Sequence, residues 1–134
     1  MNLTEARTRL AAAVSTVVVE PDGRDAFTLK CTPRPVTNNI RVGDAWVVFG
    51  TSVPGPEIGS RDVTLEALVS LGSDRELADL LVDYVEAPLL ACLDTDAELY
   101  AREISVEPQQ MVAAGSGGGR VYVLTLSAVF ELSA

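Results

Sequence analysis

The sequence predicts an α+β domain in which a mixed, mainly antiparallel sheet of about five to six strands is flanked by two helices. Three observations predict it. Hydrophobic residues recur at helical spacing near the N-terminus, an alternating strand leads directly into a second helix, and a long segment of period two closes the chain. The 134 residues suit one domain, 1–134, with one modest core.

The first expected helix covers residues 2–14. Asn2 is placed to cap it, and Glu5, three residues later, completes a box-like start. Arg7 and Arg9 are expected to point away from the core, because they lie outside the apolar stripe. The stripe contains Leu3, Ala6, Leu10, Ala13 and Val14.

A short hairpin is expected next. Residues 16–20 are rich in β-branched side chains, residues 21–23 have the Pro-Asp-Gly composition of a turn, and residues 26–31 would return as the second strand. The segment 32–43 contains two prolines and two asparagines, which predict an irregular loop.

Residues 44–50 (DAWVVFG) are expected to form the next strand. Its aromatic side chains, Trp46 and Phe49, are assigned to the core, because no basic residues interleave with them as they would in a base-stacking platform. Residues 51–60 (TSVPGPEIGS) contain two prolines and two glycines. They predict a second loop, which is a candidate contact element.

The clearest strand covers residues 62–71, where the odd-numbered positions are apolar and are expected to face the core. Leu68 is the one apolar residue on the opposite face of this strand. Something is therefore expected to cover that face at Leu68, and a neighbouring subunit is one candidate.

The clearest helix follows this strand at once. Ser73 and Glu76 have the spacing of a capping box. Pro88 is expected to kink or end the helix, because its ring displaces the hydrogen bond to the fourth carbonyl back. The expected buried stripe contains Leu77, Leu80, Leu81, Tyr84 and Val85.

A long hairpin is expected at the end of the chain, over residues 100–132, with a glycine tip at 115–119. The glycines lack the spacing of a dinucleotide or P-loop motif, and a strand follows them where both motifs need a helix. A flexible tip with Met111 and Val112 near it is a candidate docking element, ordered when a partner binds. A flexible tip with no role is the alternative.

Composition excludes several functions. The chain has 19 acidic and 10 basic residues, a formal net charge of −9 and no histidine. This excludes a domain-wide basic surface for nucleic acid and all histidine-based catalysis. Cys31 and Cys92 are too few for a zinc site and are expected to be free thiols. No catalytic residue, metal ligand set or cofactor is expected, and no segment is apolar enough to span a membrane, so the chain should be soluble and intracellular when made.

Two segments carry a family resemblance: VTLEALVSLGSDRELADLLVDYVEA (63–87) and RVYVLTLSAVFEL (120–132). Together with chain size and element order, they resemble the tail-terminator (tail completion) proteins of long-tailed bacteriophages of the siphovirus type. The resemblance implies a virion protein, made in the host cytoplasm, that forms a hexameric ring at the head–tail junction. The ring would cap the tail-tube protein, end its polymerisation and join the tail to the head connector, while DNA passes through its lumen without specific binding.

Two sets of candidate contact residues follow from this reading. The oligomer interface is expected at Leu68, Glu66, Thr64 and Arg61. Docking to the tail tube or the connector is expected at Met111, Val112, Gly115, Gly117, Gly118, Gly119, Arg120, Pro54, Pro56 and Ile58.

Two other classes of function remain open from the sequence. A head-closure or head–tail connector protein has a similar size and the same lack of chemistry. A small acidic ligand-binding domain, or an enzyme, is the alternative outside the virion. A ring separates the virion proteins from a monomeric domain, and selective binding to tube ends separates a terminator from a connector.

Overall fold

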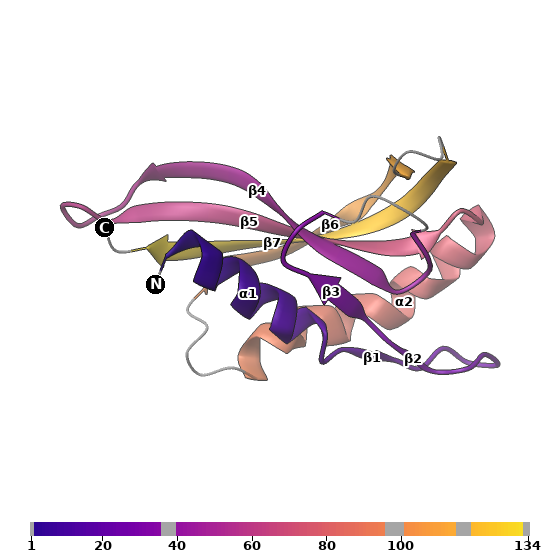
Figure 1. Cartoon of the computed structure of the whole chain (residues 1–134). Helices are drawn as coiled ribbons and strands as arrows, with labels where there is room; N and C mark the ends of the chain where they lie inside the picture. Colours follow the sequence, from indigo (N-terminus) through magenta and orange to yellow (C-terminus); the bar gives the residue numbers. More distant parts are fainter. Residues whose placement is uncertain (1, 36–39, 96–100, 115–118, 133–134) are drawn as a thin grey trace.

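The computed structural model describes residues 2–35, 40–95, 101–114 and 119–132, and for 95, 101–114, 119 and 120 it describes the backbone alone. The fold is α+β, as the sequence predicts (Figure 1). The elements in chain order are α1 (Leu3–Val14), β1 (Val18–Val19), β2 (Phe27–Thr28), β3 (Lys30–Thr32), β4 (Asp44–Pro54), β5 (Arg61–Gly72), α2 (Arg75–Ala91), the 3-10 helix η1 (Cys92–Thr95), β6 (Ala101–Ala114) and β7 (Gly119–Leu132).

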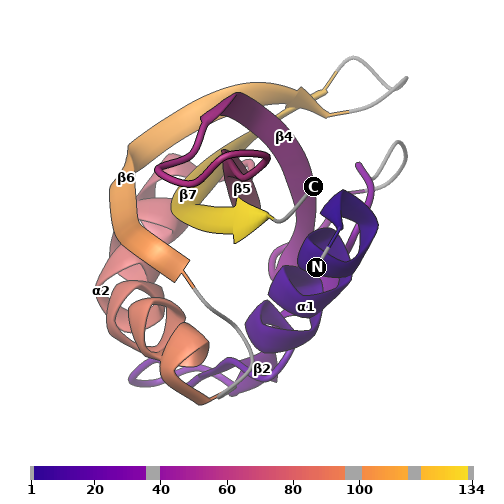
Figure 2. The same ribbon diagram turned by 90° about the vertical axis from the view of Figure 1, so that its left-hand side faces the viewer.

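The main sheet has five strands in the order β3-β4-β5-β7-β6. The β3 and β4 strands are parallel, and all other neighbours are antiparallel. The β1 and β2 strands form a separate two-stranded hairpin. Both helices lie on one side of the main sheet, and no helix of the described residues lies on its other side (Figure 2).

The core lies between the helices and the sheet. Odd-numbered residues of β5 and even-numbered residues of β7 face it, because side chains alternate along a strand. Leu65 pairs with Ala128 and Val63 with Phe130 at the centre, and all four are fully buried. The predicted core face of residues 62–71 is confirmed.

Helix α1 begins as the sequence predicts, with the Asn2 side chain accepting a hydrogen bond from the backbone N–H of Glu5 at 2.8 Å. The expectation for Arg7 is wrong, because its side chain is only 8% exposed. Its guanidinium reaches backbone carbonyls of two other segments, and Nη1 donates to Pro33 and to Val47, each at 3.2 Å. A long side chain can therefore be buried from a position beside the apolar stripe.

Helix α2 differs from the expectation at its N-terminus. Its cap is Asp74 rather than Ser73: one Asp74 carboxylate oxygen accepts from the N–H groups of Glu76 at 3.0 Å and Leu77 at 3.4 Å. The helix continues through Pro88 to Ala91. Pro88 lacks the N–H that would bond four residues back, but the remaining backbone bonds and the packing of Leu89 against the core hold the last turn.

Leu80 was expected in the buried stripe of α2, but it is 39% exposed. The buried side chains of this helix are Ala78, Leu81, Val85 and Leu89. They follow a spacing of three or four residues, as one face of a helix requires. Leu77 and Tyr84 are partly buried against the core, so Leu80 is the one residue of the predicted stripe that lies outside it.

The predicted strand 26–31 is split. Phe27 and Thr28 pair with β1 in the small hairpin. The next residue, Leu29, belongs to neither strand and is buried in the core. Strand β3 then joins the main sheet beside β4. The described parts of segment 32–43 beyond β3 contain no helix or strand, and residues 36–39 lie outside the described chain.

The expected loop 51–60 is wrong for its first four residues. Strand β4 continues to Pro54, after a register shift between Phe49 and Thr51, and only residues 55–60 form the turn. Pro54 is tolerated because β4 is an edge strand over this length: β3 pairs only with its first three residues, up to Trp46. Phe49, expected in the core, is 44% exposed beside this open edge.

Candidate assembly surface

The side of the main sheet that carries no helix is the first candidate surface. The even-numbered residues of β5 lie on it, and the register places the odd-numbered residues of β7 beside them. We call this surface the helix-free face. Its described side chains divide into an apolar end and an acidic end.

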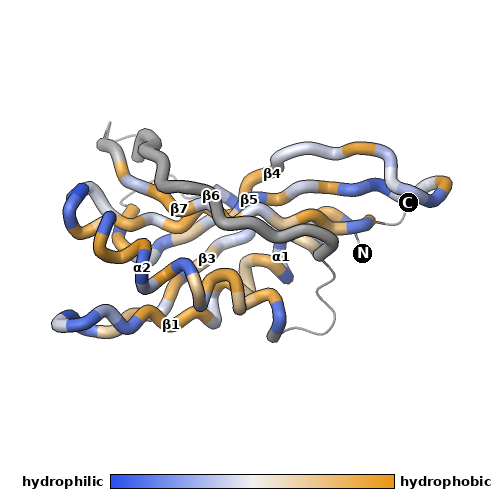
Figure 3. The backbone as a smooth tube through the Cα atoms, turned by 180° about the vertical axis from the view of Figure 1, so that it is seen from behind, coloured by the Kyte–Doolittle hydropathy of each residue, from blue (hydrophilic) through white to orange (hydrophobic). Residues whose placement is uncertain are grey.

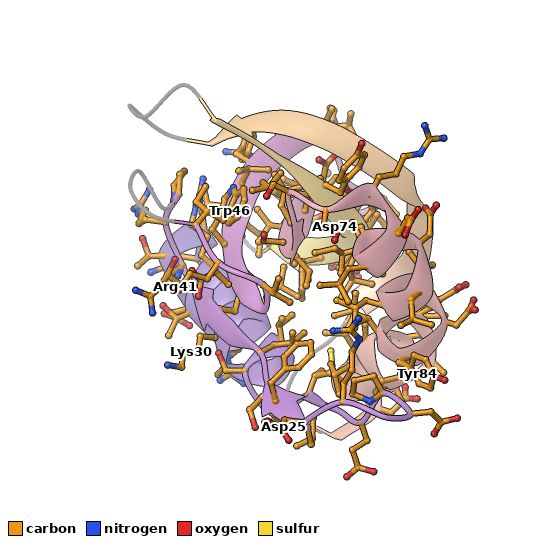
Figure 4. The ribbon with its side chains drawn as sticks, turned by 90° about the vertical axis from the view of Figure 1, so that its right-hand side faces the viewer. Asp25, Lys30, Arg41, Trp46, Asp74 and Tyr84 are labelled. Atoms are coloured by element: carbon orange, nitrogen blue, oxygen red, sulfur yellow. The ribbon has the colours of Figure 1, made fainter. Side chains whose placement is uncertain are left out.

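The apolar end is built around Trp46, which is 6% exposed and packs with the buried Val121 and Val123. Trp46 lies far from the turn that carries Asp25, on the opposite side of the view in Figure 4. Leu68 stands directly across from Trp46 in the register and is half-buried against this cluster. The chain itself therefore covers part of Leu68, for which the sequence analysis named a neighbouring subunit as a candidate.

The acidic end contains Asp62, Glu66 and Glu131, all half-buried. Glu66 pairs with Ser127, and Asp62 pairs with Glu131, so the carboxylates lie along neighbouring strands. The other described side chains at this end are Thr51, Val53, Thr64 and Val129. Among the described positions of this acidic end there is no Lys or Arg. The exposed Lys30 of β3 pairs with Asp44 and shares the parity of Trp46, so it lies on the helix-free face beyond the apolar end.

The tip of the β4–β5 hairpin is the second candidate surface. Its turn is closed by Ser60, whose hydroxyl donates to the Glu57 carbonyl at 2.8 Å and accepts from the Glu57 N–H at 3.2 Å. Gly59 takes a positive φ of 82° that the turn requires. The Ile58 side chain stands fully exposed at the end of this turn, with a relative exposure of 108%. Figure 3 shows the hydrophobic colour at this tip.

The predicted interface residues do not all come together. Thr64, Glu66 and Leu68 share the helix-free face. Arg61 has the opposite parity and lies at the base of the hairpin tip, where its Nε donates to the Ser52 hydroxyl at 2.8 Å. Arg61 is thus separated from the other three by the sheet.

The predicted docking residues occupy two places. Pro54, Pro56 and Ile58 are exposed at the hairpin tip. The backbone of Met111, Val112, Gly119 and Arg120 belongs to the paired ends of β6 and β7. Gly115, Gly117 and Gly118 lie outside the described residues.

Sequence reasoning missed a hollow at the other end of the molecule, between the β1–β2 hairpin and α2. Its volume is about 240 Å³. Apolar side chains of Pro21, Phe27, Val42, Leu77 and Leu81 line it, with Arg24 and Asp25 at its rim. We call it the socket. Its walls come from three segments far apart in the sequence, so no local pattern could reveal it.

The two cysteines are free thiols, Cys31 half-buried and Cys92 buried. Burial raises the pKa of Cys31 to about 12, with a smaller contribution from Cys92. Burial, and then the charge of Asp94, raise the pKa of Cys92 to about 11. Thiols with such raised pKa values carry little thiolate, the reactive form, near neutral pH.

Arg7 is also a buried ionisable group. Burial, and then the nearby charge of Arg34, lower the pKa of Arg7. Its Nε has no hydrogen-bond partner among the described residues, and the two hydrogen bonds that it does donate go to backbone carbonyls. The arrangement ties α1 to the segment after β3 and to β4.

No group of three His, Cys, Asp or Glu side chains that would suit a metal ion occurs within the described ranges. No helix in the described chain is long and apolar enough to cross a membrane. No known family description matches the chain, and no curated protein matches its sequence.

Proposed function

We propose that this chain is a structural virion protein that forms a hexameric ring on the end of a phage tail tube. The ring ends polymerisation of the tube and joins the tail to the head connector. Its work is done by complementary surfaces, with no catalytic step. The observation that carries the proposal beyond the family resemblance is the acidic end of the helix-free face.

This acidic end suits the lumen of a ring through which DNA slides. Carboxylates of Asp62, Glu66 and Glu131 repel phosphates, and the described positions of the acidic end carry no cation that would hold the strand. The hydroxyl groups beside them, such as Thr64 and Ser127, keep such a surface hydrated. In this proposal Thr64 and Glu66 face the lumen, and the contact between subunits lies elsewhere.

The helices would then form the outer wall of the ring. Helix α2 presents Asp79, Asp83 and Glu86 as an exposed polar row on the side opposite its buried stripe. A polar helical outside and a sheet-lined inside separate the solvent surface from the DNA channel. One chain supplies both walls.

The first test is the native mass of the purified chain, measured by light scattering and native mass spectrometry over a range of concentrations. Negative-stain electron microscopy of the same samples shows whether rings form. Closed rings with six-fold symmetry, formed alone or on adding tail-tube protein, are expected. A chain that stays monomeric under all these conditions contradicts the proposal.

A head-closure or connector protein would also form a ring with an acidic lumen. Binding of the ring to polymerised tail tubes and to isolated phage heads distinguishes the two roles. A terminator decorates the ends of tubes and ignores heads. A ring that binds heads alone would make the chain a connector.

A further inference from the structure

The tip of the β4–β5 hairpin has the properties of a docking knob. Ile58 is fully exposed, and a large apolar side chain held in water gains free energy when a partner covers it. The turn beneath it is closed by hydrogen bonds from Gly55 N–H to the Ser60 carbonyl and from Ser60 N–H to the Glu57 carbonyl, both at 3.0 Å. A turn that is already ordered loses little conformational entropy on docking.

The socket has the properties of a receptor for such a knob. Val42 is 37% exposed at its wall, although the socket is apolar. The 240 Å³ of the hollow is far above the roughly 10–15 Å³ of a site that holds one water molecule. One branched aliphatic side chain therefore fits with room for its neighbours.

The charges around the knob and around the socket are complementary. Glu57 precedes Ile58 in the tip, and Arg24 stands at the socket rim. Neither side chain has an ion-pair partner within the part of the chain that the structure describes. A second pair has the opposite arrangement: the positive Arg61 lies beside the knob, and the negative Asp25 lies at the socket rim.

The knob and the socket lie at opposite ends of the molecule. The β4–β5 tip marks one end of the long sheet, and the β1–β2 hairpin and the start of α2 mark the other (Figure 1). One copy therefore cannot fill its own socket. Two copies arranged head to tail bring the two parts together, which is a heterologous contact, and such contacts close into rings when the rotation between copies allows it.

We propose that Ile58 of one copy inserts into the socket of the next copy, between its β1–β2 turn and α2, with Glu57 beside Arg24 at the rim. This inference rests on the proposed function, since it names the contact that joins subunits of the ring. It assigns the β4–β5 tip to a second copy of this chain, whereas the sequence analysis assigned the tip to the tube or the connector.

The test uses one knob variant, Ile58→Asp, and one socket variant, Val42→Asp. Each alone is expected to weaken self-association about ten- to a hundredfold, the effect of losing one buried aliphatic side chain at the contact. Mixed in equal amounts, they are expected to form a heterodimer and nothing larger, because only one intact knob meets one intact socket. Native mass spectrometry reads the masses directly. Val53→Asp, on the same hairpin but away from the tip, is the matched control and should assemble as the wild type does.

A charge exchange tests the rim without touching apolar groups. Arg24→Glu and Glu57→Arg are each expected to weaken association about two- to fivefold, as exposed ion pairs do, and the double variant is expected to restore it. Both residues are exposed, so these variants keep the fold even where Val42→Asp does not. Circular dichroism melts check the fold of every variant.

The outcomes separate this inference from the proposed function. If Ile58→Asp still forms rings like those of the wild type, or if the mixture contains no heterodimer, the knob-and-socket contact is refuted while the proposed ring stands. Open head-to-tail chains that depend on Ile58 support the knob and overturn the ring. A wild-type chain that remains monomeric at every concentration, both alone and with tail-tube protein, overturns both.

Discussion

If the chain forms the proposed ring, reversing the charge of the acidic end of the helix-free face should convert it from a ring that does not bind DNA into one that does. The double variant Glu66→Lys, Glu131→Lys changes two carboxylates of the acidic end into cations. Each exchange alters the charge by two, so the net charge of the chain goes from −9 to −5. The wild type should show no measurable affinity for a short linear duplex.

The magnitude follows from counterion release. A protein that neutralises Z phosphates of duplex DNA loses affinity with a slope of about −0.9Z in the logarithm of salt concentration. Two lysines from one subunit give a slope of about −1.8, which is about a twelvefold loss of affinity between about 50 and 200 mM salt. Lysines from further subunits around the lumen make the dependence steeper.

Fluorescence anisotropy with linear duplex and competition with a covalently closed circular plasmid provide the assay. Linear DNA can thread a closed ring, whereas a closed circle cannot. The matched control is Asp83→Lys, Glu86→Lys, which makes the same charge change on the exposed side of α2. This control should bind both forms of DNA alike, and the helix-free-face variant should prefer the linear form. Equal binding of both forms by the helix-free-face variant would refute the placement of this face in the lumen.

Three further predictions concern stability. Gly50→Ala should lower the free energy of unfolding in urea by about 1–3 kcal/mol, because the new Cβ would lie 2.9 Å from the Thr64 carbonyl oxygen; an unchanged midpoint would contradict it. Leu68→Glu should lower the free energy of unfolding by about 1–3 kcal/mol, because it places a carboxylate against the apolar cluster on the helix-free face. The native mass of the folded variant then tests the expected role of Leu68 in oligomerisation. Stability should fall as the pH rises above about 9, because the unfolded chain releases the Cys31 and Cys92 protons there while the folded chain, with pKa values of about 12 and 11, keeps them. Denaturation of Cys92→Ala across the same pH range should show a shallower fall.

The sheet could be predicted well from the sequence where one rule decides the outcome. In residues 62–71, alternation leaves only two possible faces, and burial of one of them settles the orientation of every side chain. The same holds for β7, where Leu124, Leu126 and Phe130 all face the core. Period two is a strong signal because a shift by one residue would expose the whole set.

The prediction fails where two local signals compete. Ser73 and Asp74 are adjacent and both are good caps, and only the backbone decides: Asp74 has the extended conformation of a cap, with φ −88° and ψ 115°. Pro54 and Pro56 predict a loop, yet a proline can end an edge strand as well as begin a turn. Which residue ends β4 depends on β3 being short, and that is a property of the sheet.

Contacts between distant segments could not be predicted at all. Arg7 reaches the carbonyl of Val47, on a strand that lies far along the chain. The socket likewise needs Val42 and Leu77 to meet beside the β1–β2 turn. Composition did point to the tip that carries Ile58 as a contact element, but its partner becomes apparent only when both ends of the molecule are seen together.

The strand order has a consequence for how fast the chain folds. The neighbouring strands β5 and β7 are separated along the chain by α2, η1 and β6, so Leu65 pairs with Ala128 across a long stretch of sequence. A long loop must close, at a cost in entropy, before these distant strands can form contacts. The chain should therefore fold slowly, as domains of high contact order do. A nascent chain that lacks β7 exposes the Val63–Leu71 face of β5, and chaperone binding at that stage would protect it until synthesis is complete.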